Sequence, residues 1–192
     1  MFENLSDYQI ILASKSPRRR QLLAELGIPF EVKTMEVDET FPASMLVEDV
    51  PVYLAKQKAI PFINTISETD LIITSDTIVA INNEILGKPA NYSEAFEMLE
   101  KLSGKLHQVI TGVNLFSTNK SVAFTVFTNV YFKHLSDQEI DYYITKFKPF
   151  DKAGAYGIQE WIGHIGVERI EGSYFNVMGL PIQRLYEELR KF

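Results

Sequence analysis

The sequence has no cysteine, one tryptophan and three histidines among its 192 residues. The absence of cysteine excludes disulfide bonds, thiolate zinc sites and a cysteine nucleophile. The chain also lacks an apolar run close to the roughly 18–20 residues that a membrane-spanning helix needs. Its first seven residues are acidic and do not have the basic start of a secretory signal peptide. We therefore expect a cytoplasmic protein that has no membrane partner.

Positive charge is not in excess, because 19 Lys and Arg residues against 25 Asp and Glu residues give a net charge of −6. This balance argues against a protein that coats nucleic acid. Hydrophobic residues make up 46% and charged residues 23%, which is ordinary for a soluble globular protein. The length is sufficient for one large domain or two small lobes with a substantial core.

One basic cluster stands out on this acidic chain, in residues 10–22. Ile10 to Ala13 are apolar and predict a short buried strand. Ser16 is a natural helix cap, Pro17 suits the first helical position, and three arginines then fall in the first turn. Each cation there costs roughly 0.3–1 kcal/mol against the helix dipole. Together with the free backbone N–H groups, this favours a bound phosphate chain; the alternative is a solvated basic turn above a buried leucine face.

The second informative stretch is Leu71 to Ile81, an apolar and β-branched run long enough for a central strand. Asp76 lies in its middle, although aspartate is depleted from strands and a buried carboxylate is costly without partners. Two alternatives stay open. Either the run is broken by a turn at Ser75–Asp76, or Asp76 sits in a polar cleft with a cation or a proton to handle. Lys88 follows on a short loop, Gly87 to Pro89.

Strands and helices alternate along the rest of the chain, and we find no internal repeat or linker. We expect strands at 30–37, 107–116 and 122–132, helices at 51–60, 91–102, 137–147 and 182–192, and a second hairpin formed by 167–170 and 174–177. This order predicts an α/β fold in which helices flank a mixed twisted sheet. We place the division between two lobes in the hairpin at 107–132 and the ligand cleft between the lobes.

The polar exceptions to this pattern indicate phosphate chemistry. The candidate cations and hydroxyls are Ser14, Lys15, Ser16, Arg18, Arg19, Lys58 and Lys88, and the candidate carboxylates are Glu39 and Asp76. Cations alone would make a phosphate-binding module, whereas carboxylates beside them would permit metal-assisted phosphoryl or pyrophosphoryl transfer. No P-loop or glycine-rich dinucleotide motif is present. None of the three histidines has a metal-ligand spacing or stands where a Ser-His-Asp triad needs it.

Residues 12–23, Leu-Ala-Ser-Lys-Ser-Pro-Arg-Arg-Arg-Gln-Leu-Leu, resemble the opening motif of the Maf (septum formation) family of nucleoside triphosphate pyrophosphatases. Matching blocks follow in order at 37–39, 54–59, 75–79, 85–89, 98–104, 111–113, 151–159, 172–174 and 179–181. The resemblance covers essentially the whole chain. It implies a single domain, residues 1–192, with an ITPase-like or Maf-like fold.

The resemblance also implies a reaction and a site. The reaction is hydrolysis of a nucleoside triphosphate between the α and β phosphates, assisted by a divalent cation, Mg or Mn. The implied catalytic residues are Asp76, Glu39, Lys58 and Lys88, with Asp76 activating water and with Asp76 and Glu39 holding the metal. The implied substrate-binding residues are Ser14, Arg18, Arg19, Thr77 and Gln159, of which the last three match positions linked to substrate choice. The block 151–159 is similar to the branch acting on dTTP and UTP, and a glutamine amide can both donate to and accept from a pyrimidine edge.

Two other interpretations stay open. A non-catalytic nucleotide- or nucleic-acid-binding protein in cell-division control would use the same arginines but would not need Asp76, Glu39 and Lys88. House-cleaning of modified pyrimidine triphosphates would use the same site. The family resemblance implies a homodimer as well, and the aromatic segment Phe124 to Phe132 could supply that surface or belong to the core.

Overall fold

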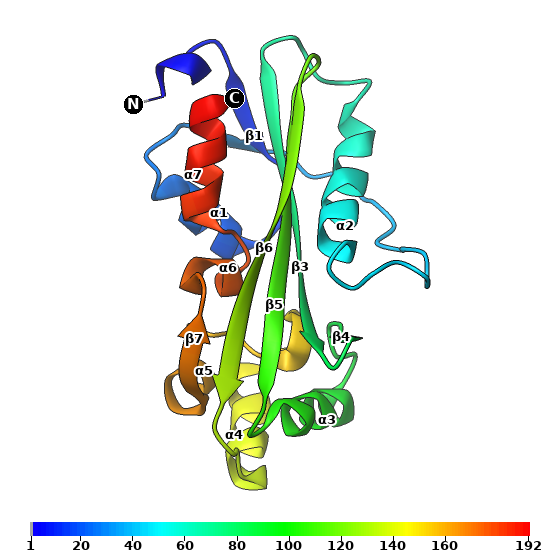
Figure 1. Ribbon diagram of the computed structural model, residues 1–192, viewed down its shortest axis with the longest axis vertical. Coiled ribbons are helices and arrows are strands. Elements are labelled where there is room, and N and C mark those ends of the chain that lie inside the picture. The colour runs from blue at the N-terminus through cyan, green and yellow to red at the C-terminus, as the bar shows by residue number, and fades with distance from the viewer. Residues whose placement is uncertain (1) are drawn as a thin grey trace. The chain divides into compact units, whose positions relative to one another are not determined.

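The computed structural model describes residues 2–192, and within them the strands form one mixed sheet (Figure 1). The strands are β1 (Gln9–Leu12), β2 (Glu31–Val32), β3 (Asp70–Ile81), β4 (Glu84–Leu86), β5 (Leu106–Phe116), β6 (Ser121–Phe132) and β7 (Val167–Glu171). Their order is β2-β1-β3-β5-β6-β7, with β4 paired to β3. β1 is parallel to β2 and β3, whereas β4 and β7 are antiparallel to their partners. The predicted α/β class with a mixed sheet is therefore confirmed.

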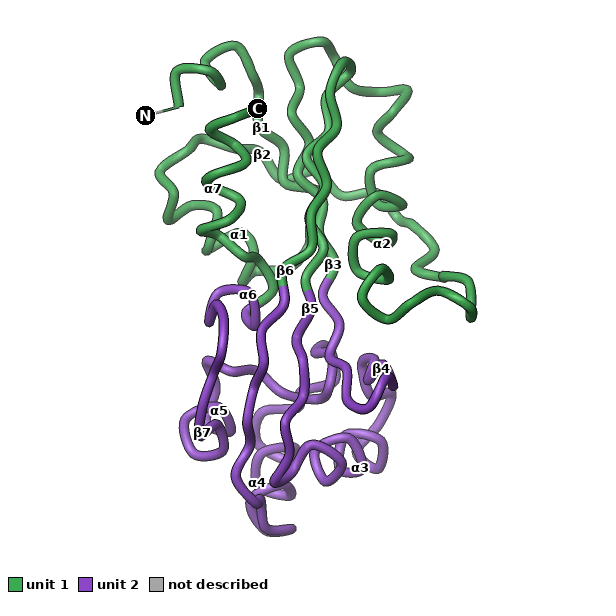
Figure 2. The backbone as a smooth tube through the Cα atoms, viewed as in Figure 1, with its two compact units in different colours: residues 1–76, 111–126, 179–192 green, residues 77–110, 127–178 purple. Residues whose placement is uncertain are grey.

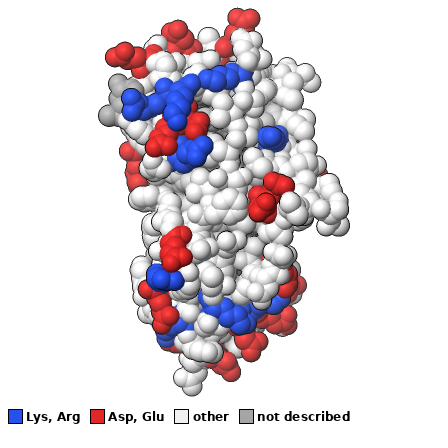
Figure 3. All heavy atoms as spheres, viewed as in Figure 1, with Lys and Arg blue, Asp and Glu red and all other residues white. Residues whose placement is uncertain are grey.

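Helices connect these strands. They are α1 (Pro17–Ala24), α2 (Val50–Ala59), α3 (Tyr92–Leu102), α4 (Asp137–Phe147), α5 (Trp161–Gly166), α6 (Tyr174–Met178) and α7 (Ile182–Lys191), with short 3₁₀ turns η1 (Glu3–Leu5), η2 (Ile60–Phe62) and η3 (Ala153–Ala155). No helix within residues 2–192 combines the length and hydropathy that crossing a membrane requires. On the face drawn in Figure 3, basic and acidic side chains are intermixed.

The chain divides into two compact units (Figure 2). Unit 1 comprises residues 1–76, 111–126 and 179–192, and unit 2 comprises residues 77–110 and 127–178. Strands β3, β5 and β6 contribute residues to both units. Two of the boundaries fall within the β5–β6 hairpin, where the sequence predicted the division between lobes.

In unit 1, the core forms around the parallel pair β1 and β3, with α1 and α7 on one face of the strands and α2 on the other (Figure 1). The first part of β3, residues 71–75, is almost wholly inaccessible to solvent. Leu22 and Leu23 of α1 and Leu185 and Leu189 of α7 are also buried. Each such side chain contributes about 1.5–3 kcal/mol by its removal from water. The core thus fixes the end of β1 and the middle of β3.

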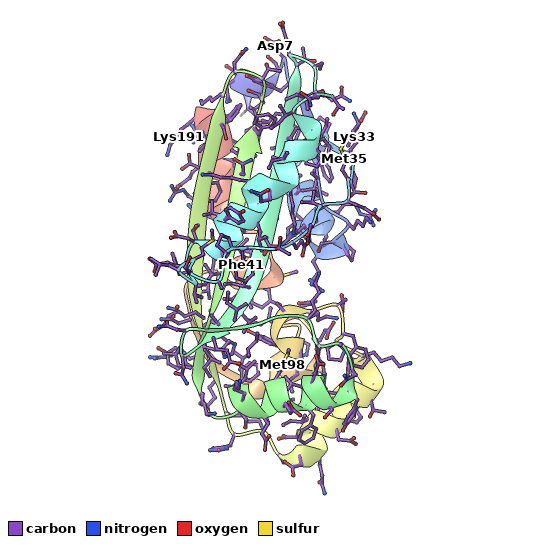
Figure 4. The ribbon with its side chains drawn as sticks, turned by 90° about the vertical axis from the view of Figure 1, so that its right-hand side faces the viewer. Asp7, Lys33, Met35, Phe41, Met98 and Lys191 are labelled. Atoms are coloured by element: carbon purple, nitrogen blue, oxygen red, sulfur yellow. The ribbon has the colours of Figure 1, made fainter. Side chains whose placement is uncertain are left out.

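In unit 2, α3 and α4 pack together and begin at well-formed caps. The Asn91 side chain accepts a hydrogen bond from Glu94 N, and Ser136 with Glu139 forms a complete capping box. Each cap of this kind stabilises its helix by about 1 kcal/mol. The buried face of α3 carries Leu99, while Met98, labelled in Figure 4, is half-buried. Both predicted helix starts are confirmed.

The predicted strand at 30–37 is much shorter in the structure. Only Glu31 and Val32 form β2, and they pair with Ile11 and Leu12. β1 ends at Leu12 because the chain then turns into α1, so the residues after Lys33 have no strand to pair with. The remaining residues lie in the exposed loop that leads to α2.

The predicted hairpin formed by 167–170 and 174–177 is wrong in its second half. Residues 174–178 form α6, and β7 instead pairs with β6. The side chain of Ser173 accepts a hydrogen bond from Asn176 N at 3.3 Å, as a helix cap does. Thr128 holds Ser173 in place through two further hydrogen bonds. These contacts outweigh the strand preference of Tyr174 and its neighbours.

Candidate functional site

The basic cluster lies at the turn from β1 into α1. β1 ends at Leu12, and α1 begins at Pro17 with Ser16 as its cap, as predicted. Ser16 Oγ accepts from Arg19 N at 3.4 Å, and Ser14 Oγ accepts from Ser16 N at 3.2 Å. Both hydroxyls keep their own O–H donor for another acceptor. The turn therefore offers two hydroxyl donors beside a helix N-terminus, which is a suitable place for an anion.

Arg19 ties α1 to two neighbouring segments of unit 1. Its Nε donates to Gly179 O at 2.8 Å, and its Nη1 donates to Ser75 O at 2.9 Å. The last backbone hydrogen bond between β1 and β3 joins Ala13 N to Ile73 O. Arg19 therefore donates to Ser75 O, a carbonyl of β3 that lies beyond the end of β1. The guanidinium fork fits this double role because its donors have a fixed geometry.

The charges around Arg19 show which other candidates lie near it. Burial lowers the pKa of Arg19, and the negative charge of Asp76 acts in the opposite direction. Arg18 lowers the pKa of Arg19 further, and Glu39 raises it. Arg18 is half-buried, whereas Lys15 is exposed. The helix mouth and both candidate carboxylates therefore belong to one electrostatic environment.

Lys58 joins the two carboxylates directly. Its Nζ lies 2.6 Å from Asp76 Oδ1 and 2.9 Å from Glu39 Oε1. Asp76 is only 8% exposed, while Glu39 comes from the exposed loop that leads to α2. Phe41, labelled in Figure 4, lies two residues further along that loop. One ammonium thus compensates two acids from different elements.

The docking of α2 on β3 explains how Lys58 meets Asp76. Thr74 Oγ1 donates to Ala55 O at 2.6 Å, which fixes α2 against β3. Thr74 and Asp76 point to the same face of the strand because side chains alternate. Lys58 follows Ala55 by about one helical turn and so faces Asp76.

These contacts decide between the two alternatives for Asp76. β3 runs without a break from Asp70 to Ile81, so there is no turn at Ser75–Asp76. The nearly buried carboxylate has a cation to balance it, namely Lys58. Removing one member of such a pair generally costs about 3–5 kcal/mol where the site is fully buried.

The oxygen donors available to a divalent metal are the carboxylates of Asp76 and Glu39. Within residues 2–192, no group of three or more His, Cys, Asp or Glu side chains could hold a metal ion by itself. The carboxylates of Asp76 and Glu39 nevertheless lie close together, because both contact the ammonium of Lys58. Mg²⁺ is commonly bound by one or two carboxylates that act together with water and substrate phosphates. The two acids fit a cation that is shared with a phosphate ligand.

The other three candidates belong to unit 2. Thr77 follows Asp76 on β3 and is half-buried, Lys88 lies exposed on the loop after β4, and Gln159 is half-buried after η3. Gly154 N donates to Gly87 O at 3.0 Å, so the loop of Lys88 and the loop of Gln159 are joined. A Cβ at Gly154 would lie 2.9 Å from Val79, and its φ of +66° also favours glycine.

Sequence reasoning missed a second polar cluster in unit 2. Lys152 is nearly buried and contacts Asp151 and Glu160, and Glu160 also accepts a hydrogen bond from Tyr143. The pattern gave only a weak signal for it, namely polar residues set into a run of glycine and alanine at 151–159.

His107 lies on β5, within the strand predicted at 107–116, and its side chain is wholly buried. Its Nε2 lies 2.7 Å from the Tyr156 hydroxyl. Burial lowers the pKa of His107 to about 3 and raises that of Tyr156, so both are neutral at pH 7. This pair belongs to the core of unit 2.

Comparison with known proteins gives several matches over most of the chain. A family model described as Maf-like protein matches residues 9–192. Relatives named dTTP/UTP pyrophosphatase include proteins from Phocaeicola vulgatus (57% identical) and Bacteroides thetaiotaomicron (50% identical), each covering 100% of both chains. A relative of the same name from Christiangramia forsetii is 47% identical and covers 98% of this chain and 96% of its own. Among solved structures, a HAM1 protein from Coxiella burnetii has a TM-score of 0.42 and 14% identity, and the match covers 65% of this chain and 73% of that one.

Proposed function

This chain belongs to the Maf family, and from that premise we propose that it is a nucleoside triphosphate pyrophosphatase acting on dTTP and UTP. The products are the nucleoside monophosphate and pyrophosphate. Three relatives carry the name dTTP/UTP pyrophosphatase at 47–57% identity over nearly full length, which supports this substrate class.

The observation that carries the proposal is the meeting of Asp76 and Glu39 on the ammonium of Lys58. Arg19 bonds to Ser75 O, next to Asp76, so the acids adjoin the mouth of α1. A protein that only bound nucleotide would need the cations and hydroxyls of that mouth. It would not need a nearly buried acid pair, which repels phosphate unless a metal ion lies between them. Acids beside a phosphate site serve hydrolysis.

We propose that the phosphate chain is held at the mouth of α1. Ser14 offers its hydroxyl, the N-terminal end of the helix dipole favours an anion, and Arg18 offers a guanidinium. The N–H groups of Arg19 and Arg20 are already bonded to Ser16. Lys58 has three N–H donors, of which two face Asp76 and Glu39, so the third can reach a phosphate oxygen. Lys88 is proposed as a further cation on the family resemblance, and its exposure leaves it accessible.

We propose that Asp76 and Glu39 hold the divalent cation, Mg or Mn, together with phosphate oxygens. When bound, that cation lowers the pKa of water and neutralises charge on phosphate. Asp76 accepts the proton of the attacking water, and its nearly buried position keeps bulk water from solvating its carboxylate. Lys58 Nζ lies 2.6 Å from Asp76 Oδ1, so its positive charge balances this nearly buried carboxylate.

Substrate choice is proposed for Arg19, Thr77 and Gln159. For Arg19 the structure favours an indirect role, since two of its N–H groups donate to backbone carbonyls. For Gln159 the chemistry favours base recognition, because an amide can donate to one atom and accept from the next.

A cytoplasmic location and a homodimer belong to the same proposal. In the segment considered for a dimer surface, Phe124 and Phe132 are buried in the core, and Phe127 is 44% exposed. Light scattering on the purified protein measures the oligomeric state, and a mass of one chain would contradict the dimer.

The test of the proposed function is a pyrophosphate-release assay over a panel of nucleoside triphosphates, with Mg²⁺, with Mn²⁺ and with EDTA. We expect release from dTTP and UTP that EDTA abolishes. Binding of these nucleotides without release would favour the non-catalytic alternative. Faster release from modified pyrimidine triphosphates would favour house-cleaning as the main activity.

A further inference from the structure

A buried polar cluster in unit 2 has no part in the proposed chemistry. We call it the loop clamp, and it consists of Tyr143, Lys152 and Glu160. Lys152 Nζ lies 3.1 Å from Glu160 Oε1, and the Tyr143 hydroxyl donates to Glu160 Oε2. Tyr143 comes from α4, Lys152 lies in the loop that follows α4, and Glu160 precedes α5 directly at the end of that loop. The clamp therefore ties this loop to α4.

Two of the three clamp residues are buried, and the side chain of the third, Glu160, is 20% exposed. Lys152 is 8% exposed and Tyr143 is 0% exposed. Burial raises the pKa of Tyr143, and the hydrogen bond to Glu160 raises it further, so Tyr143 stays a donor. Buried charges are costly, and hydrophobic residues of similar size would often stabilise a fold at least as well. A buried charged clamp thus suggests a need for one defined loop geometry.

The clamp controls the backbone on both sides of Gln159. Gly157 N donates to the Tyr143 hydroxyl at 3.0 Å, and Glu160 N donates to Gly157 O at 3.0 Å. Glu160, which directly follows Gln159, is held through its carboxylate by Tyr143 and Lys152. A Cβ at Gly157 would lie 2.8 Å from Glu160 Cδ, so a side chain there would displace the Glu160 carboxylate. Gln159 is therefore carried by a backbone segment that the clamp fixes before and after it.

We propose that Tyr143, Lys152 and Glu160 are positioning residues that set the selectivity for pyrimidine triphosphates by fixing the backbone that presents Gln159. The proposal rests on the proposed function and deepens it. The clamp touches no substrate in this account and acts only through Gln159. A clamp that merely stabilised unit 2 would affect the melting temperature and leave selectivity unchanged.

Neighbouring tyrosines on α4 provide a matched pair for the test. Tyr143→Phe removes the hydroxyl that joins Gly157 N and Glu160, whereas Tyr142→Phe removes a hydroxyl from a 41% exposed ring whose partner is Lys146. We measure kcat and KM for UTP and for GTP in both variants. For Tyr143→Phe we expect the ratio of kcat/KM for UTP to that for GTP to fall about 5- to 10-fold, mainly through KM for UTP. Two hydrogen bonds of the Tyr143 hydroxyl are lost, and only part of that loss reaches Gln159. Tyr142→Phe is expected to keep the wild-type ratio.

A double-mutant cycle checks that the effect passes through Gln159. In the Gln159→Ala background, Tyr143→Phe is expected to cause no further loss of selectivity. Glu160→Gln serves as a second variant should Tyr143→Phe fold poorly, because Asp151 still contacts Lys152 at 2.7 Å. A wild-type selectivity ratio in a folded clamp variant, or an additive loss in the Gln159→Ala background, would overturn the positioning role. Absence of any hydrolysis by the wild-type protein would overturn the proposed function itself.

Discussion

The ammonium of Lys58 lies 2.6 Å from Oδ1 of Asp76, on the face of β3 that α2 covers. An acid in the middle of a buried strand is an unusual feature of the sequence. The contact explains it, because the positive charge of Lys58 compensates the Asp76 carboxylate. Glu39 shares the same ammonium, so the unit 1 site contains two acids around one cation.

Replacing Lys58 tests this arrangement without substrate. Lys58→Met leaves Asp76 nearly buried beside a second acid and without its cation, so we expect a loss of about 1–3 kcal/mol in the free energy of unfolding. Lys56→Met is the control, because Lys56 is exposed on the same helix. Urea unfolding with and without Mg²⁺ provides the measurement. The two acids of Lys58→Met should bind the ion, so Mg²⁺ should raise its stability more than that of Lys56→Met. Equal stabilities and equal metal responses would contradict the pairing.

Arg19→Lys tests the double backbone contact of Arg19. A lysine cannot donate to Gly179 O and Ser75 O in the same fixed geometry. We expect a loss of about 1–3 kcal/mol in unfolding free energy, because charged donors to buried carbonyls are lost. Arg20→Lys, at an exposed position on the same helix, should be nearly neutral. Thermal unfolding of the two variants compares them directly, and matching melting temperatures would show that Arg19 holds neither segment.

His107 predicts how stability depends on pH. Its pKa is about 3 in the folded chain against an ordinary value of 6.5, so between these values the unfolded chain binds more protons. The stability linked to the neutral His107 side chain is fully present above pH 6.5. As the pH falls toward 3, the free energy of unfolding decreases by about 1.4 kcal/mol per pH unit. His107→Gln should remove this share of the acid sensitivity, and His164→Gln, at an exposed position, should retain it. Unfolding free energies at pH 7, 6 and 5 measure the slope, and a slope unchanged in His107→Gln would rule out this source.

Local signals predicted the start of α1 well, because the information lies within a few residues. Ser16 caps the helix, and Pro17 occupies its first turn, as their chemistry dictates. The turn between β3 and β4 is local as well, because Asn82 and Asn83, a residue type common in tight hairpin turns, adopt positive φ angles there. These elements need no distant partner to form.

Local sequence patterns could not predict the contacts between segments that are far apart in the chain. The sequence left open what compensates Asp76, because Lys58 is 18 residues away and meets it only after α2 docks through Thr74. The helix at 174–178 was missed since aromatic and β-branched residues prefer strands, while Ser173 and its partner Thr128 impose a cap.

The loop clamp was missed for a related reason. Tyr143 lies on the buried face of α4, where an aromatic residue is expected as core. Its hydroxyl becomes informative only when Gly157 and Glu160 are seen to converge on it. Sequence patterns identify which residues are polar, whereas the fold decides which of them meet.

The proposed hydrolysis depends most on Asp76 accepting the proton of the attacking water. The most direct measurement is single-turnover release of pyrophosphate from dTTP by Asp76→Asn, together with the affinity of the same variant for dTTP. Asparagine keeps the size and one oxygen acceptor for Lys58 but is no base at pH 7. We predict a rate at least about 100-fold below wild type, in the range of general-base catalysis, with nucleotide binding still measurable. A wild-type rate in Asp76→Asn would contradict the account.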